Sequence, residues 1–278
     1  MIETDANEPD ILGALWEDGN PAVLTLTSRV TTKDHAVNLG EATVPPPADM
    51  SSFGRFLKAT KFIPIDGIVK KTSDAITGRG GTDLERARKI YEWIVENTFR
   101  DPKVRGCGTG DIRFMLESND LGGKCADLNA LFVGLARAAG IPARGVYGLR
   151  VAKSAHGLRS LALSSDDATK AQHCRAEVYL TGYGWVPVDP ADVRKVMLEE
   201  PPGNLPLQDA KVEAAHKRLF GSWEMNWLAL NTAQDVVLPN SKGPKLPFFM
   251  YPNGESGGER LDSLEPDKFK YAITAAEV

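Results

Sequence analysis

Apolar residues recur at helical spacing in residues 81–99, where they occupy five positions: Leu84, Ala87, Tyr91, Ile94 and Val95. This spacing places them on one face and predicts an amphipathic helix. Thr82, followed three residues later by Glu85, is the pattern of a capping box, in which the two residues satisfy each other's free groups at a helix start. The helix is therefore expected to begin directly after Thr82.

A second stretch, residues 126–139, is apolar on nearly every side. A helix without a polar face is expected to lie inside the protein, and Gly140 and Pro142 supply the signals that end it. Residues 208–220 predict a third helix, with Gly221 just past its end.

Alternating and β-branched residues predict strands in several places. The expected strands are residues 22–30, 143–152, 173–180 and 185–190, with later ones at 247–252 and 268–274. The sequence TGYG between residues 180 and 185 predicts a turn, so the two flanking strands should form a β-hairpin. Because the helices come first and the antiparallel strands later, the pattern indicates the α+β class.

Composition narrows the range of partners. The chain has 278 residues, of which 42% are hydrophobic, and a formal net charge of −4, so it can bury a full core but lacks the basic surface that nucleic acid or an anionic membrane would need. The acidic start MIETDANEPD has no apolar signal core, and Arg137 interrupts the most apolar later stretch. We expect a soluble chain without a membrane span, with an earlier removed export signal left open.

The three cysteines cannot form a disulfide framework in a chain of this length, and their odd number leaves at least one free thiol. Cys125 lies at the tip of the expected buried helix, where unpaired N–H groups and the helix dipole stabilise a thiolate. Gly122 and Gly123 would leave room for a substrate carbonyl, and the Cys125 N–H could donate to an oxyanion. From position alone, a buried structural cysteine is an equally good interpretation.

The hairpin supplies the groups that a catalytic thiol needs. His173 opens its first strand and Asp189 closes its second, so the two should lie opposite each other or one residue out of register, on the same face. The order Cys, His, Asp therefore predicts a base and an orienting carboxylate for Cys125. Cys174 should point to the opposite face, into the core, and Cys107 lies in a loop.

Two other sites are disfavoured by the same residues. A zinc site built from the three cysteines and His173 would lack any C-x-x-C pair, and neighbouring residues on opposite strand faces do not readily bind one ion. A phosphate-binding loop fails because Ser118 stands at the first glycine position and Cys125 replaces the Ser or Thr that would hold magnesium. No metal or cofactor is expected.

At these residues the sequence resembles the transglutaminase-like superfamily of papain-like thiol enzymes. Residues 122–148 (GGKCADLNALFVGLARAAGIPARGVYG) look like the bacterial cysteine motif, and residues 172–191 (QHCRAEVYLTGYGWVPVDPA) look like the histidine and aspartate motifs. The resemblance implies a papain-like, transglutaminase-core fold, in which a helix that begins at the catalytic cysteine packs on an antiparallel sheet. It covers about residues 80–195.

Carried onto this chain, the resemblance makes Cys125 the nucleophile, His173 the base and Asp189 the orienting carboxylate. Gln172 and the GCGTG loop (residues 106–110) are candidates for the second oxyanion donor, although backbone shaping is the favoured interpretation of both. Trp185 is a substrate-site candidate, with covering of the His–Asp pair as its favoured role.

The implied activity is a thioester acyl-enzyme formed from an amide. Hydrolysis would make the protein a protease or amidase, and transfer to an amine would make it a transglutaminase; hydrolysis is favoured. The expected partners are a peptide or protein substrate with an amide or glutamine side chain and an amine as a candidate acceptor, without nucleic acid or membrane. The alternative is a non-enzymatic peptide-binding module that keeps the fold.

Two further expectations concern organisation and location. We expect a short N-terminal β appendage over residues 1–60 and a transglutaminase-like catalytic domain over residues 61–278. Relatives of this kind are often exported to the periplasm, while the chain itself carries no signal, so both the periplasm and the cytoplasm are candidate locations.

Overall fold

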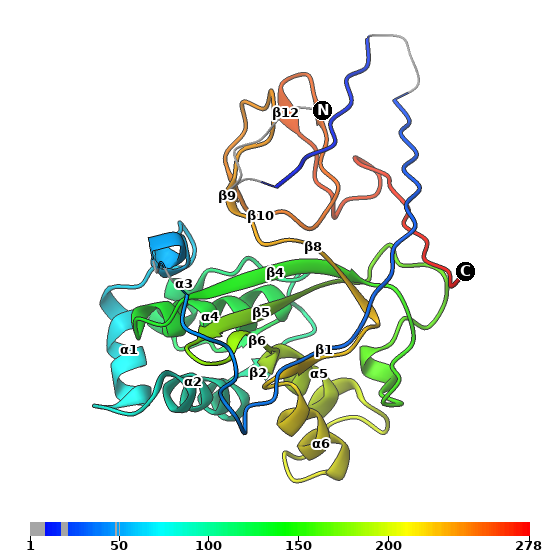
Figure 1. Ribbon diagram of the computed structural model, residues 1–278. Coiled ribbons are helices and arrows are strands. Elements are labelled where there is room, and N and C mark those ends of the chain that lie inside the picture. The colour runs from blue at the N-terminus through cyan, green and yellow to red at the C-terminus, as the bar shows by residue number, and fades with distance from the viewer. Residues whose placement is uncertain (1–8, 18–21, 48, 50) are drawn as a thin grey trace.

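The protein is built around a four-stranded antiparallel sheet. The computed structural model describes residues 9–17, 22–47, 49 and 51–278. The sheet has the strand order β6-β5-β4-β8. Its strands are β4 (Ala143–Arg150), β5 (Gln172–Leu180), β6 (Gly184–Val188) and β8 (Trp227–Asn231). In Figure 1 the long strands β4 and β5 cross the centre of the molecule, with α4 beside them.

Helices lie around this sheet, and the chain order agrees with the α+β class. They are α1 (Gly67–Thr77), α2 (Asp83–Asn97), α3 (Ile112–Ser118), α4 (Cys125–Ala138), α5 (Pro190–Glu199) and α6 (Ala210–Arg218), with two 3-10 turns, η1 (Ser51–Leu57) and η2 (Arg159–Leu161). Short strand pairs complete the described elements: β1 (His35–Ala36) with β7 (Ser222–Trp223), β2 (Phe99–Arg100) with β3 (Gly122–Gly123), β9 (Gln234–Val236) with β10 (Leu246–Phe248), and β11 (Glu255–Ser256) with β12 (Glu259–Arg260).

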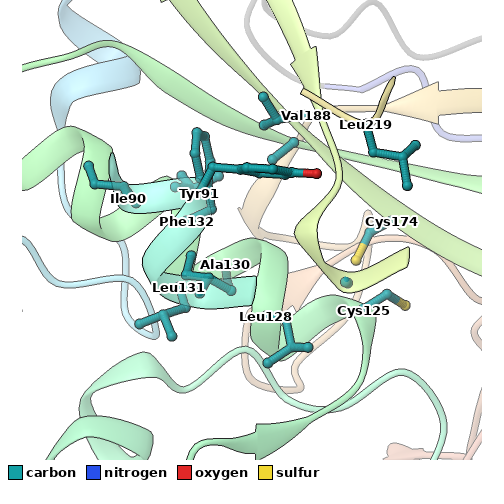
Figure 2. Packing of buried hydrophobic residues seen from close by; sticks show 14 of the residues in the cluster. Ile90, Tyr91, Cys125, Leu128, Ala130, Leu131, Phe132, Cys174, Val188 and Leu219 are labelled. Atoms are coloured by element: carbon teal, nitrogen blue, oxygen red, sulfur yellow. The ribbon is translucent and has the colours of Figure 1, made fainter. Parts of the chain in front are cut away.

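Helix α4 forms the centre of the core, as its apolar pattern predicts. Every residue from Cys125 to Ala138 is buried. Leu128, Leu131 and Phe132 are among the largest fully buried side chains, and each such burial contributes about 1.5–3 kcal/mol. Figure 2 shows this packing, with Tyr91 of α2 above the α4 side chains. The helix that begins with Cys125 is therefore firmly held.

Helix α2 begins as predicted. The Thr82 hydroxyl accepts a hydrogen bond from the Glu85 backbone N–H at 3.2 Å, and the Glu85 carboxylate accepts from the Thr82 backbone N–H at 2.7 Å. The capping box is thus complete on both sides. This fixes the start of a helix whose buried face packs against α4.

Two expected strands are not formed. Residues 22–30 have no strand pairing in the structure, and their apolar side chains stay exposed, for example Val23 and Leu26. Residues 268–274 make only one isolated bridge, between Thr274 and Asp167. Both predictions were wrong because alternation describes a strand's faces but cannot supply a neighbouring strand to pair with.

The N-terminal segment extends from the C-terminal segment to the far side of the sheet. In Figure 1 its dark-blue first part lies beside the orange and red C-terminal segment, and the chain then continues to β1, which pairs with β7. The proposed division at residue 60 stays a prediction. None of the helices in the described ranges is both long and apolar enough to cross a membrane.

Candidate active site

Cys125 is the first residue of α4, and a neighbouring loop is tied to this helix start. Asp127 accepts hydrogen bonds from the backbone N–H groups of Thr109 and Gly110, both at 2.9 Å, and from that of Lys124 at 3.0 Å. A Cβ at Gly108 would lie 1.8 Å from an Asp127 carboxylate oxygen, and its φ is +95°, so only glycine fits there. The GCGTG loop therefore shapes the backbone around Cys125, as favoured from the sequence.

The two glycines before Cys125 have a different role from the one expected. A Cβ at Gly122 would lie 2.4 Å from the Phe99 ring, and one at Gly123 would lie 2.6 Å from the Asp127 Cβ. Both positions hold glycine because β2, β3 and the first turn of α4 approach one another closely here. Clearance for a substrate is not needed to explain them.

His173 and Asp189 meet as the hairpin predicts, although not by the expected register. His173 Nε2 lies 2.7 Å from Asp189 Oδ2, and both side chains are buried. Val188 pairs with Ala176, so the continued register places Asp189 across from Arg175, two residues from His173. The contact forms because Asp189 leaves the strand and caps helix α5, where its carboxylate accepts from the Asp192 N–H.

The shared face was predicted correctly. The pairs Glu177–Pro187 and Tyr179–Trp185 lie directly opposite each other on β5 and β6, so the odd-numbered residues of both strands point to one side. Cys174, on the other side, is buried in the main hydrophobic cluster, as expected.

A second carboxylate and two arginines surround the pair. Asp192 Oδ2 lies 3.3 Å from His173 Nε2, and the Arg150 guanidinium contacts both Asp192 oxygens, at 2.5 and 2.7 Å. Arg175 Nε lies 3.5 Å from Asp189 Oδ2. All of these side chains are buried, so the interactions are weakly screened.

Asn129 of α4 connects the nucleophile helix to this group. Its Nδ2 donates to Asp189 Oδ1 at 3.1 Å and to the Cys174 carbonyl at 2.8 Å. Asn129 lies four residues after Cys125, so both side chains occupy one face of α4. That spacing is the signal by which the sequence could have identified Asn129.

The charges around His173 set the protonation of the pair. Burial alone would lower the pKa of His173, but the carboxylates of Asp192 and Asp189 outweigh burial and raise it to about 9. Burial and repulsion from Asp192 raise the pKa of Asp189. For Asp192, burial is opposed by Arg150 and His173, which hold its pKa well below the usual range.

The surroundings of the Cys125 thiol favour its thiolate form. The neighbouring thiols of Cys107 and Cys174 lower its pKa well below the ordinary value; burial opposes them, and the nearby His173 adds to the lowering. Figure 2 shows the Cys125 and Cys174 side chains near each other at the edge of the core. Cys125 is only 4% exposed. The structure thus places His173 in contact with Asp189 and close enough to Cys125 to act on its pKa, and the catalytic roles of the three residues stay predictions.

The side-chain amide of Gln172 makes other contacts. Gln172 Nε2 donates to the Thr169 carbonyl at 3.1 Å and to the Tyr271 hydroxyl at 3.4 Å, so both of its amide hydrogens have other acceptors. Its role as an oxyanion donor stays a prediction without support from these contacts.

Trp185 packs in an aromatic group at the other end of β6 from Asp189. Its ring centroid lies 4.8 Å from that of Phe56 and 5.6 Å from that of Tyr179. This contradicts the expectation that Trp185 covers the His–Asp pair, and a substrate role for it stays a prediction. Trp227 is nearer, since its indole N–H donates to the His173 carbonyl at 2.9 Å.

His173, Asp189 and Asp192 offer ligand atoms within 4.8 Å of one another, which is a geometry that could hold a metal ion. Arg150 contacts Asp192 and Arg175 lies beside Asp189, so two cations already compensate the two carboxylates. A further cation here would meet two guanidinium groups in a buried site. These contacts favour the acid–base interpretation.

A cysteine at a helix start, beside a histidine–aspartate pair from the adjoining sheet, is the arrangement of thiol-dependent enzymes. Residues 70–190 match the transglutaminase-like superfamily. The chain is also 40% identical over 276 residues to an uncharacterized protein of Haemophilus influenzae, covering 94% of this chain and 74% of that protein. The protein belongs to the transglutaminase-like superfamily.

Two solved structures resemble part of this chain. The periplasmic domain of TgpA from Pseudomonas aeruginosa is 20% identical, with a TM-score of 0.39 over 54% of this chain and 49% of that one. A red sea bream transglutaminase is 16% identical, with a TM-score of 0.30 over 44% of this chain and 26% of that one. The chain thus spans about half or less of these two structures.

Proposed function

We propose that the protein is a cysteine-dependent acyl-transfer enzyme acting on amide bonds of peptides or proteins, with hydrolysis as its main outcome. The observation that carries this proposal is the 2.7 Å contact between His173 Nε2 and Asp189. It occupies one ring nitrogen and leaves Nδ1 to exchange a proton with Cys125, whose pKa is already lowered by its surroundings.

The reaction follows from these three groups. The Cys125 thiolate attacks the amide carbonyl carbon and forms a C–S bond, and the C–N bond breaks as the His173 imidazolium gives its proton to the leaving amine. Water, deprotonated by His173, then attacks the thioester, which releases a carboxylic acid and returns the thiol. If an amine attacks instead, the product is a new amide. Asp189 orients the imidazole throughout.

Alkylation tests the nucleophile first. Iodoacetamide at neutral pH should modify Cys125 faster than Cys107 in the native protein, since only Cys125 is expected to be a thiolate. Peptide mapping by mass spectrometry measures the two rates. Equal, slow labelling of both cysteines would count against the proposal.

Activity tests the reaction. A glutamine-containing peptide library, with and without an added amine, should show hydrolysed products by mass spectrometry, and amine adducts would identify transglutamination. Cys125→Ala should lower the rate by at least about 10³-fold. It should keep the fold, because one small buried side chain replaces another, with a loss of less than about 1.5 kcal/mol.

The low exposure of Cys125 favours one alternative, a peptide-binding module without catalysis. Binding of library peptides with equal affinity to the unchanged protein and to Cys125→Ala, with no product from either, would support it. Export to the periplasm is a further proposal, to be checked by fractionating cells that express the gene with its natural upstream region.

A further inference from the structure

His173 contacts more negative charge than the proposed reaction requires. One carboxylate is enough to orient a catalytic imidazole, and Asp189 is in place for that at 2.7 Å. Asp192 brings a second carboxylate oxygen to 3.3 Å from the same Nε2. Two buried carboxylates that contact the same ring nitrogen repel each other, so the presence of the second one needs a physical explanation.

Asp192 is not free to move away or to neutralise itself. Arg150 Nη2 contacts both of its oxygens, at 2.5 and 2.7 Å, while Arg150 Nη1 donates to the Leu161 carbonyl at 3.0 Å. Both side chains are buried, at 4% and 1% exposure. A buried ion pair with such contacts keeps Asp192 ionised and directed at the imidazole.

The charges around the ring balance only when the thiol and imidazole are an ion pair or both are neutral. The titratable and charged groups are Cys125 on α4, Arg150 on β4, Cys174 and Arg175 on β5, Asp189 at the N-cap of α5, Asp192 and Lys195 on α5, and Glu224 before β8. Lys195, which interacts with Asp192, and Glu224, which interacts with Arg175, carry opposite charges and offset each other. The two aspartates offset the two arginines. Without Asp192, an imidazolium would face a surplus positive charge in a weakly screened interior.

We propose that Asp192, fixed by Arg150, is a positioning residue that stabilises the imidazolium of His173 and, through it, the thiolate of Cys125. This rests on the proposed function, because it assumes that the thiolate is the reactive form. The two residues of this ion pair act in opposite directions on the His173 ring. The Asp192 carboxylate favours the charged imidazole, and the Arg150 guanidinium disfavours it.

That opposition gives the first test, an NMR titration of His173 in the Cys125→Ala background, where no thiolate contributes. The chain has four histidines, so loss of one signal in His173→Gln assigns it. Asp192→Asn should lower the midpoint of the titration by about one pH unit, and Arg150→Met should raise it. A merely structural role would move both variants in the same direction.

The second test uses the intact thiol. If Asp192→Asn raises the pKa of the Cys125 thiol by about one unit, iodoacetamide alkylation of Cys125 should slow by up to about tenfold at pH values below that pKa. Glu200→Gln is the matched control, because Glu200 is a buried carboxylate at the other end of α5 that bonds to Ser160. It should leave the alkylation rate unchanged.

The outcomes separate the two proposals. Slow, unselective alkylation of the unchanged protein overturns the proposed function, whereas normal alkylation with a His173 midpoint unmoved by Asp192→Asn overturns this inference alone. If Asp192→Asn does not fold, Arg150→Met and the charge-balanced double variant Arg150→Met/Asp192→Asn replace it. The inference then requires the His173 midpoint to rise in Arg150→Met and to be lower in the double variant than in Arg150→Met.

Discussion

The imidazole of His173 lies inside the protein, where burial would favour its neutral form. The neighbouring carboxylates reverse that preference and raise its pKa to about 9, while the pKa of Cys125 is held low. Both changes in pKa favour the thiolate of Cys125 together with the imidazolium of His173. At the scale of single residues, the site is thus suited to attack by sulfur and protonation of a leaving amine near neutral pH.

This predicts the pH dependence of the activity. As the pH rises past about 9, His173 loses the proton that the leaving amine needs, so kcat/KM should fall on the alkaline side. The acid side should fall only below the ordinary range of a thiol, as Cys125 becomes protonated. Initial rates on the best library peptide between pH 5 and 10.5 measure the profile. A rate that rises steadily to pH 10.5 would contradict the assignment of His173.

At the scale of elements, strand β4 controls how closely its neighbours approach the site. Gly148 pairs with His173 on β5 and with Ala229 on β8. A Cβ at Gly148 would lie 2.2 Å from the Leu228 carbonyl oxygen and 2.5 Å from the Trp227 ring. A backbone atom cannot give way as a flexible side chain can, so the sheet accepts only glycine here.

Gly148→Ala is therefore expected to destabilise the protein by about 1–3 kcal/mol, because β8 must shift away from β4. Urea unfolding followed by circular dichroism measures the change. Gly54→Ala is a suitable control, since no described atom beyond the neighbouring residues of the chain lies within 4 Å of the added methyl position. Equal stability of the two variants would show that β8 adapts at no cost.

Element patterns also show what local sequence can predict. The capping box and apolar face located α2, and the all-round apolar pattern located α4, because helices use contacts within one segment. The alternation of residues 22–30 and 268–274 misled, since a strand exists only beside a partner that the local sequence does not contain. Period two placed His173 and Asp189 on one face, but the contact depended on α5 starting at once after β6.

At the scale of the whole molecule, the C-terminal segment packs on the loop beside Cys125. Leu264 and Tyr251 lie against Gly106, where a Cβ would be 2.7 and 3.0 Å from them. Arg105 forms exposed ion pairs with Asp262 at 2.8 Å and with Glu265 at 3.0 Å. The Arg105–Glu265 pair alone joins two parts of the chain that are 160 residues apart.

We expect Arg105→Ala to loosen this contact and expose Cys125 more often. Exposed ion pairs are weak, so the alkylation rate should rise by no more than about fivefold. Arg113 of α3 forms a similarly exposed ion pair with Asp66, so Arg113→Ala serves as the control. It should leave the alkylation rate of Cys125 unchanged. A slower rate in Arg105→Ala than in Arg113→Ala would mean that the C-terminal segment supports the site instead of covering it.

The sequence by itself determined the α+β class, the helix that begins at Cys125 and the hairpin that carries His173 and Asp189, because each depends on periodicity or on residues close together in the chain. Only the tertiary structure decided that Asp192, Arg150 and Arg175 join them, and that Gly122 and Gly123 serve packing. The reason is that charge balance and close approach depend on distances between separate elements, and these arise only when the whole core is packed.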